Sequence, residues 1–298
     1  MSPDRAVEAV REAFVAHARG EWTMPPKVYV TNYPAGDFRA MPALGGGYAL
    51  LKWITSFPGN PARELPTVTG VVLVSDAETG QLRAMLDAAS VTALRTGAAA
   101  VLAAEVLGRA DAQSAAVVGA GVNGRAVART FLARGHPVAV WDLDPSRVAR
   151  VADELGCDVA ESRERALAAD LVATVTPGHD VLLHEGALRP GQHVSLMGAD
   201  GPGKAEASAL ELGRAHLFCD DWEQASHGGE LAHAVDEGIV TIDDVTALGD
   251  VLAGTARGRA NEQEITMFDS TGLAIQDLAI AIAALEAADV DALPRLEL

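Results

Sequence analysis

Three glycines stand at the spacing that binds the phosphates of a dinucleotide. Residues 119–124 read Gly-Ala-Gly-Val-Asn-Gly and fit G-x-G-x-x-G, after a buried apolar run and before a helical segment. Gly119 is expected to allow a tight turn, Gly121 to admit a pyrophosphate, and Gly124 to let helix and strand pack closely. The helix N-terminus would supply N–H groups to the phosphates. The alternative is a glycine-rich turn without a ligand, since the chain contains 29 glycines.

A carboxylate occupies the position expected of a ribose ligand. Asp142 ends the second apolar segment, roughly twenty residues beyond the glycines. It would accept hydrogen bonds from both ribose hydroxyls and repel a 2′-phosphate, and Asp144 adds a second negative charge. These residues favour NAD over NADP. The candidate cofactor-binding residues are Gly119, Ala120, Gly121, Val122, Asn123, Asp142, Thr176 and Gly198.

Lys52 is a charged residue inside an otherwise hydrophobic segment, 48–57. Such a lysine either extends to solvent from a sheet edge or lies in a cavity where it has a chemical role. Partial desolvation would lower its pKa and suit it to bind or protonate a developing charge. Composition leaves both interpretations open.

Arg95 and Asp200 are two further candidates. Arg95 falls in the first turns of an alanine-rich helix, 91–107, where a guanidinium is a good carboxylate receptor. A surface salt bridge is the alternative. Asp200 follows the apolar strand 193–197, at the carboxyl-end crevice where open parallel sheets bind ligands. It is suited to act as a general acid or base, or merely to cap a turn.

The elements around these residues predict an α/β protein with two domains. Extended segments without an intervening long helix indicate an antiparallel or mixed sheet, and they lie at 28–30, 48–57, 67–74 and 82–86. From residue 115, apolar strands alternate with helices, which indicates a doubly wound parallel (Rossmann) sheet. The segment from Phe268 is expected to form one amphipathic helix against the first domain. The expected division is 1–112 with 268–298, and 113–267.

Composition excludes several classes of function. The net charge of -18, without a basic block, disfavours nucleic acid and anionic membranes. Cys157 and Cys219 match no metal or redox spacing, and no metal site is expected. The amphipathic N-terminal segment is unlike a secretory signal, and the apolar stretch 273–285 is interrupted by Asp277 and too short to span a bilayer. We expect a soluble, cytoplasmic protein.

Nine segments form a more specific pattern. They are 24–29, 36–43, 51–53, 58–61, 94–99, 198–204, 220–225, 227–230 and 268–277. Together they resemble the ornithine cyclodeaminase/mu-crystallin family over nearly the whole chain, closest to its archaeal-type alanine dehydrogenase branch. The resemblance implies a Rossmann domain joined to a domain that forms a homodimer through its sheet, with substrate between the two domains.

The resemblance also implies roles for individual residues. Lys52 and Asp200 match the family's catalytic pair, Arg95 matches a residue that binds the substrate carboxylate, and Lys27 and Arg39 line the same pocket. Arg39 stands where a cyclodeaminase is expected to carry an acidic residue for the far amine of ornithine. A cation there would repel that amine, which disfavours ornithine cyclisation.

The resulting hypothesis is an NAD-dependent oxidoreductase that interconverts a small, alanine-like amino acid and its 2-oxo or 2-imino acid. The first alternative is a reductase of cyclic ketimines such as pyrroline- or piperideine-2-carboxylate. Ornithine cyclodeamination and a non-catalytic binding role, as in mu-crystallin relatives, are further alternatives.

Overall fold

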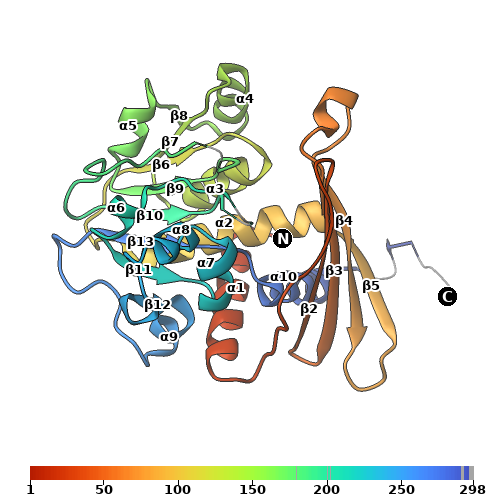
Figure 1. Ribbon diagram of the computed structural model, residues 1–298. Helices are drawn as coiled ribbons and strands as arrows, with labels where there is room; N and C mark the ends of the chain where they lie inside the picture. Colours follow the sequence, from red (N-terminus) through yellow and green to blue (C-terminus); the bar gives the residue numbers. More distant parts are fainter. Residues whose placement is uncertain (179, 200, 202, 290–291, 295–298) are drawn as a thin grey trace.

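The computed structural model describes residues 1–178, 180–199, 201, 203–289 and 292–294, and it contains two β-sheets separated by helices (Figure 1). The first sheet is antiparallel, with its strands in chain order: β1 (Val28–Asn32), β2 (Gly36–Gly45), β3 (Tyr48–Ser56), β4 (Val68–Asp76) and β5 (Leu82–Asp87). It forms one edge of the molecule in Figure 1.

The second sheet is parallel throughout its described pairs. Its strands lie in the order β12 (Val245–Ala247), β11 (His216–Cys219), β13 (Thr266–Asp269), β10 (His193–Leu196), β9 (Leu171–Thr174), β6 (Ala115–Val118), β7 (Val138–Trp141) and β8 (Asp158–Val159). Helices cover it: α3 (Val122–Ala133), α4 (Pro145–Leu155), α5 (Arg163–Leu167), α6 (Ala209–Leu212), α7 (Trp222–Gly228), α8 (Ala232–Asp236) and α9 (Leu248–Ala253). The predicted α/β class with a Rossmann-type sheet is confirmed.

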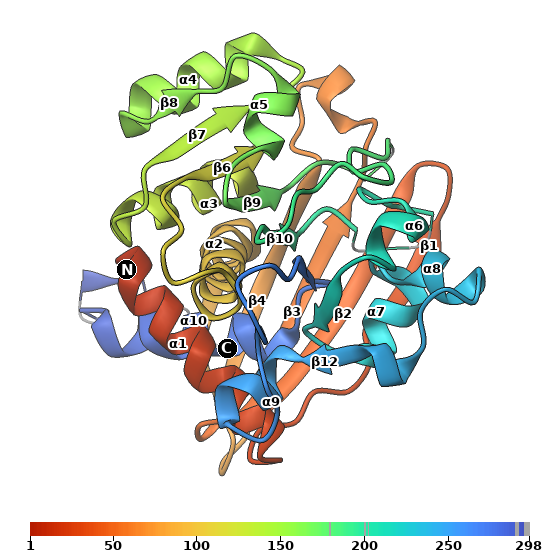
Figure 2. The same cartoon turned by 90° about the vertical axis from the view of Figure 1, so that its left-hand side faces the viewer.

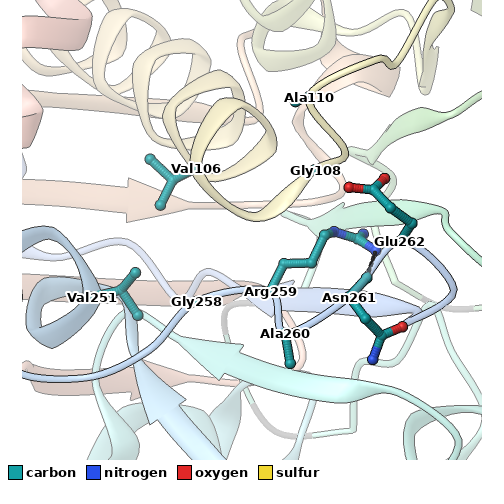
Figure 3. Close-up of a pocket in the computed structure, with 9 residues that line it drawn as sticks. All are labelled: Val106, Gly108, Ala110, Val251, Gly258, Arg259, Ala260, Asn261 and Glu262. Atoms are coloured by element: carbon teal, nitrogen blue, oxygen red, sulfur yellow. Dashed lines mark hydrogen bonds between the residues drawn. The ribbon is translucent and has the colours of Figure 1, made fainter.

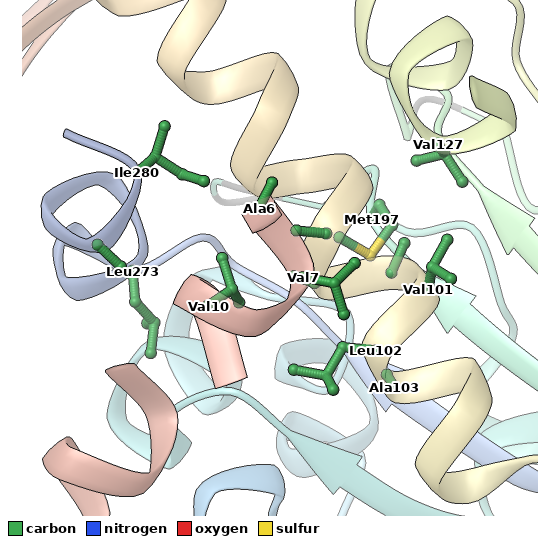
Figure 4. Close-up of a cluster of buried hydrophobic side chains, with 14 of the residues drawn as sticks. Ala6, Val7, Val10, Val101, Leu102, Ala103, Val127, Met197, Leu273 and Ile280 are labelled. Atoms are coloured by element: carbon green, nitrogen blue, oxygen red, sulfur yellow. The ribbon is translucent and has the colours of Figure 1, made fainter. Parts of the chain in front are cut away.

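Three helices fill the space between the sheets, as Figure 1 shows: α1 (Pro3–Ala18), α2 (Ala88–Leu107) and α10 (Ala274–Ala287), and Figure 2 shows the same helices after a turn of 90°. Their apolar side chains form one core that includes Val7, Val10, Leu102 and Ile280 (Figure 4). By length and composition α2 could span a membrane, yet 67% of its most apolar window is buried inside the fold. Its apolar character is that of a core helix.

One strand was not predicted, and one predicted element is wrong. The segment 36–45 was not expected as a strand, yet it forms β2, which pairs with β1 and β3 along its length. The chain from Phe268 is not one amphipathic helix, because Thr266–Asp269 form β13 and α10 begins only at Ala274. Residues 274–281 are all buried, so the first two turns of α10 are enclosed on every side, although they include the polar Gln276 and Asp277.

The position of β13 also bears on the expected domain boundary. β13 lies between β11 and β10 in the parallel sheet, and the boundary expected between residues 267 and 268 falls inside it. The chain leaves the parallel sheet after Asp269 and enters α10, which packs against α1, β2 and β3. This crossing brings the carboxyl end of β13 close to the first sheet.

Candidate active site

The glycine loop joins the end of β6 to the start of α3. Gly119 has φ +111°, and a Cβ there would lie 2.5 Å from the carbonyl oxygen of Val175. A Cβ on Gly124 would collide with the carbonyl of Gly119, whereas one on Gly121 would meet nothing within 4 Å. Gly121 is the N-cap of α3, and no side chain caps this helix. The helix N-terminus is therefore open to a phosphate.

Asp142, directly after β7, holds the glycine loop. Its Oδ2 accepts a hydrogen bond from the backbone N–H of Ala120 at 2.7 Å, and its Oδ1 accepts from that of Asp144 at 2.9 Å. Two neighbouring apolar side chains, Val122 and Leu143, are 70% and 82% exposed. The carboxylate is thus fixed beside an open, partly apolar surface, which suits a nucleoside.

Lys52 lies in β3, the middle strand of the five, and is only 1% exposed. The alternative of a lysine extending from a sheet edge is therefore excluded. Its Nζ donates hydrogen bonds to Oδ1 and Oδ2 of Asp277 on α10, at 2.9 and 3.1 Å. Burial lowers the pKa of Lys52 to about 8; Asp277 opposes that shift and the cation of Arg95 adds to it. Lys52 can therefore exchange a proton near neutral pH.

Arg95 is the second cation at Asp277. Its Nε lies 3.7 Å from Asp277 Oδ1, and its side chain is 12% exposed, so it is not a surface ion pair. That buried Nε has no hydrogen-bond partner among the described residues. Gly272 has φ +77°, and a Cβ there would collide with the guanidinium. Two cations share one carboxylate here, which leaves a net positive charge for an anionic ligand.

Lys27 and Asp220 lie on either side of the loop that follows β13. Lys27 Nζ donates to the carbonyl oxygen of Thr271 at 2.7 Å. Asp220 follows β11 and accepts hydrogen bonds from the N–H of Gly272 at 2.8 Å and the hydroxyl of Thr271 at 3.0 Å. Burial raises the pKa of Asp220, and Lys27 acts against that rise. These contacts fix the loop between Lys27 and Arg95.

Arg39 is paired with a carboxylate on its own strand. Its Nε and Nη2 donate to Oδ1 and Oδ2 of Asp37 at 2.6 and 3.3 Å, and its guanidinium carbon lies 5.4 Å from the ring centroid of Tyr29. Arg39 lies in β2, on the same face as Met41, which pairs with Lys52. The structure thus places Arg39 near Lys52, and its charge contributes to the lowered pKa of Lys52.

A buried glutamate, Glu206, joins the carboxyl ends of the two central parallel strands. Its Oε1 accepts from the N–H and hydroxyl of Thr176 at 2.9 and 2.7 Å. Its Oε2 accepts from the hydroxyl of Thr174 at 2.7 Å and the N–H of Gly198 at 2.9 Å. Two candidate cofactor residues, Thr176 and Gly198, are thus brought together by a residue that the sequence analysis did not single out.

The packing of the helices brings the cation cluster and the glycine loop to neighbouring positions. A Cβ on Gly97, two residues beyond Arg95, would lie 2.8 Å from the carbonyl of Ala126 on α3. The loop at Thr271 and Gly272 continues from the carboxyl end of β13. The cations therefore lie at the carboxyl edge of the parallel sheet, where doubly wound folds bind ligands. Asp200, the other predicted catalytic residue, is outside the described residues.

Sequence reasoning missed three acidic residues of this site. Asp277 was noted only as an interruption of an apolar stretch, although a lone acid there signals a buried cationic partner. Asp220 follows a strand, as Asp142 does, and the same rule would have found it. No local pattern distinguishes Glu206, because its four donors come from two distant strand ends.

A separate cavity of about 370 Å³ lies at the C-terminal end of α2, whereas Arg95 lies near the N-terminal end of that helix (Figure 3). Its lining includes Gly108, Ala110 and the segment 258–262, which precedes β13. Arg259 donates there to the carbonyl oxygens of Leu107 and Gln192 at 2.7 and 3.0 Å. The lining lies near the amino ends of the parallel strands, and its arginine serves to join chain segments.

Known proteins share this arrangement over almost the whole chain. Alanine dehydrogenase of Archaeoglobus fulgidus is 40% identical over 288 residues, which are 94% of this chain and 89% of that protein. A solved archaeal alanine dehydrogenase dimer with bound NAD superposes with a TM-score of 0.93 at 39% identity, covering 99% of this chain and 94% of the other. Δ1-Pyrroline-2-carboxylate reductase of Thermococcus litoralis, solved with NADH and L-proline, superposes with a TM-score of 0.89 at 26% identity. The match covers 96% of this chain and 93% of that one.

The family model matches as broadly as these relatives do. It spans residues 1–290, and therefore includes both sheets, the glycine loop and the Lys52–Asp277 pair. The chain belongs to the ornithine cyclodeaminase/mu-crystallin family.

Proposed function

We propose that this protein is an NAD-dependent oxidoreductase that interconverts a small, alanine-like L-amino acid and its 2-imino or 2-oxo acid. The observation that carries the proposal is the buried Lys52, with a pKa lowered to about 8, beside an arginine whose charge is only partly compensated. Both lie at the carboxyl edge of a Rossmann-type sheet. The alanine dehydrogenase relative, at 40% identity, supports the choice of substrate.

The described residues fit a nicotinamide dinucleotide. The uncapped N-terminus of α3 and the open space at Gly121 suit the pyrophosphate, and the carboxylate of Asp142 suits the adenosine ribose. Thr176 and Gly198 would contact the nicotinamide half. When bound, the cofactor accepts hydride from the amino acid or returns it to the imine.

Arg95 and Lys27 would bind the carboxylate of the substrate. In a chain of net charge -18 an anionic substrate needs such local cations. Arg39, held by Asp37, would border the same pocket. Fixing the carboxylate orients the substrate's Cα toward the cofactor, and such positioning accounts for a large part of enzymatic rate enhancement.

Lys52 would polarise the carbonyl or imine as an ammonium group and lose its proton more easily because it is buried. Asp200 would transfer the protons of water and ammonia. In the oxidative direction, an amino acid, water and NAD⁺ give a 2-oxo acid, ammonium, NADH and a proton.

We also propose a cytoplasmic location, and a two-domain division close to residues 112 and 269.

A cyclic ketimine reductase is the second candidate. It uses the same hydride transfer to a C=N bond and the same carboxylate receptor but needs no free ammonia. This alternative is supported by the pyrroline-2-carboxylate reductase of Paracoccus denitrificans, which is 34% identical over 93% of this chain.

The first test is NADH oxidation, followed at 340 nm, with pyruvate plus ammonium and, separately, with piperideine-2-carboxylate. We expect turnover with pyruvate only when ammonium is present, and a loss of about a thousandfold in kcat for Lys52→Met. Turnover with the cyclic imine alone would favour the second candidate. Absence of turnover with both, despite NADH binding, would contradict both candidates.

The pKa of Lys52 should depend on Asp277. In Asp277→Asn the anion that raises this pKa is lost while burial remains, so Lys52 should titrate below pH 8. Since the ammonium form is the active one in reduction, the alkaline fall of kcat should move to lower pH. The chain has only three lysines, Lys27, Lys52 and Lys204, so NMR of ¹⁵N-lysine-labelled protein can follow the titration directly. An unchanged or higher pKa would disprove the coupling.

Cofactor choice should depend on Asp142. The wild type should prefer NADH to NADPH by about a hundredfold in kcat/KM, because the carboxylate repels a 2′-phosphate. Asp142→Ser with Leu143→Arg should reverse the preference, since it replaces the repelling anion with a phosphate receptor. Leu143→Arg alone is the control and should keep the NADH preference. A wild type that uses both cofactors equally would contradict this role of Asp142.

We further propose that the chain forms a homodimer through the outer face of the antiparallel sheet. The helices α2 and α10 cover the inner face, whereas the outer face exposes apolar side chains. These are Val28, Val30, Leu44, Leu51, Trp53 and Met85, which the strand register places on one face. The archaeal relative was solved as a dimer.

Light scattering should give a wild-type mass of twice the 30.9 kDa chain. Trp53→Lys should give the monomer mass, because it places a charge in the middle of the apolar face. Leu210→Lys, at a 54% exposed residue on α6, is the control and should remain dimeric. A monomeric wild type at micromolar concentration would rule out this interface.

A further inference from the structure

Glu206 is a fully buried charged residue at the edge of the sheet where the cofactor is expected. Its side chain accepts hydrogen bonds from Thr174, Thr176 and Gly198, and not from Lys27, Arg39, Lys52 or Arg95, among the described residues. β9 and β10 pair up to Thr174 and Leu196, and their last backbone hydrogen bond runs from Met197 N–H to the carbonyl of Thr174, at 2.9 Å. Beyond that bond the two chains stay close, since a Cβ on Gly198 would lie 2.5 Å from the carbonyl oxygen of Thr176. Among the described residues it is the Glu206 carboxylate, and not a further backbone hydrogen bond, that joins them there.

The carboxylate accepts four hydrogen bonds, two on each oxygen. Oε1 takes the N–H and hydroxyl of Thr176, and Oε2 takes the hydroxyl of Thr174 and the N–H of Gly198. Four is the number of acceptor positions that an ionised carboxylate offers. Burial raises the pKa of Glu206, and its hydrogen bonds from Thr176 and Thr174 act against that rise.

The surroundings leave this carboxylate little freedom. A Cβ on Gly198 would lie 2.5 Å from Glu206 Cδ, so the strand end packs directly on the carboxylate. The backbone N–H groups of Glu206 and Ala207 donate to Oε1 of the buried Glu230, at 2.7 and 2.6 Å. Glu230 thus fixes the backbone of Glu206, and the Glu206 side chain fixes both strand ends.

We propose that Glu206 is a positioning residue for the nicotinamide half of the cofactor: it sets the spacing of Thr176 and Gly198 at the carboxyl ends of β9 and β10. This inference rests on the proposed binding of NAD at that edge. Glu206 acts through these two residues.

Glu206→Gln tests this role because glutamine has the size of glutamate but cannot accept hydrogen bonds from all four donors. A carboxamide has one acceptor oxygen, so in either orientation its NH₂ group faces a backbone N–H, of Thr176 or of Gly198. The hydrogen bond of that N–H is lost and two donors oppose each other, whereas the neighbouring threonine hydroxyl can turn to accept from the NH₂ group. The strand ends should then move apart.

The measurement compares the Kd of NADH with that of ADP-ribose, which lacks the nicotinamide. In Glu206→Gln we expect the Kd of NADH to rise about tenfold, that of ADP-ribose to stay within about twofold, and kcat to fall at least tenfold. Thr174→Val removes one donor to Glu206 and should raise the Kd of NADH about threefold. If Glu206→Gln does not fold, Thr174→Val decides the question.

Glu211→Gln is the matched control. Glu211 is also fully buried and accepts from the N–H groups of Gly186 and Leu188, at 2.7 and 2.8 Å, but on α6. It should lower the thermal midpoint without changing the ratio of the two Kd values. The inference is overturned if Glu206→Gln or Thr174→Val leaves that ratio unchanged, or if Glu211→Gln changes it equally. A wild type that binds NADH but turns over no amino or imino acid contradicts the proposed function and leaves this inference standing.

Discussion

The buried ion pair between Lys52 and Asp277 is the constraint on which the rest of the site depends. It joins β3 to α10 across 225 residues of sequence, and both side chains are at most 1% exposed. Removing two charges from water costs several kcal/mol per ion, and an apolar pair of the same size would commonly be as stable. Stability therefore does not explain the pair. The pair fixes a lysine of lowered pKa beside an arginine, and this chemical role is a reason to retain the pair.

The charges around the pair determine what the site can bind. Lys52 and Arg95 share one carboxylate, Arg39 is paired with Asp37, and Lys27 lies near the buried Asp220. Among these groups four cations face three carboxylates, which leaves about one positive charge uncompensated in a protein that otherwise repels anions. A small amino or imino acid with one carboxylate matches that balance.

Carboxylates also organise the edge of the parallel sheet. Asp142, Glu206 and Asp220 each accept backbone N–H groups from loops that leave the carboxyl ends of strands. Such N–H groups have lost their partners in the ladder, and a buried carboxylate satisfies several of them at once. The loops that are expected to contact cofactor and substrate are therefore held by acidic residues behind them.

The α/β class, the glycine loop with Asp142 and the unusual position of Lys52 could be predicted from the sequence, because they are local patterns of spacing and hydrophobicity. Strand β13 was not predicted, because four residues are too few for a periodic signal. A helix was predicted from Phe268 instead. The folded arrangement was needed to show that Asp277 pairs with Lys52, that Asp220 holds the loop beside Arg95, and that Glu206 joins two strand ends. Each of these contacts joins groups distant in the chain, so no local pattern reveals it. A buried charge indicates that a partner exists, but the packing of α10 between the two sheets selects which one.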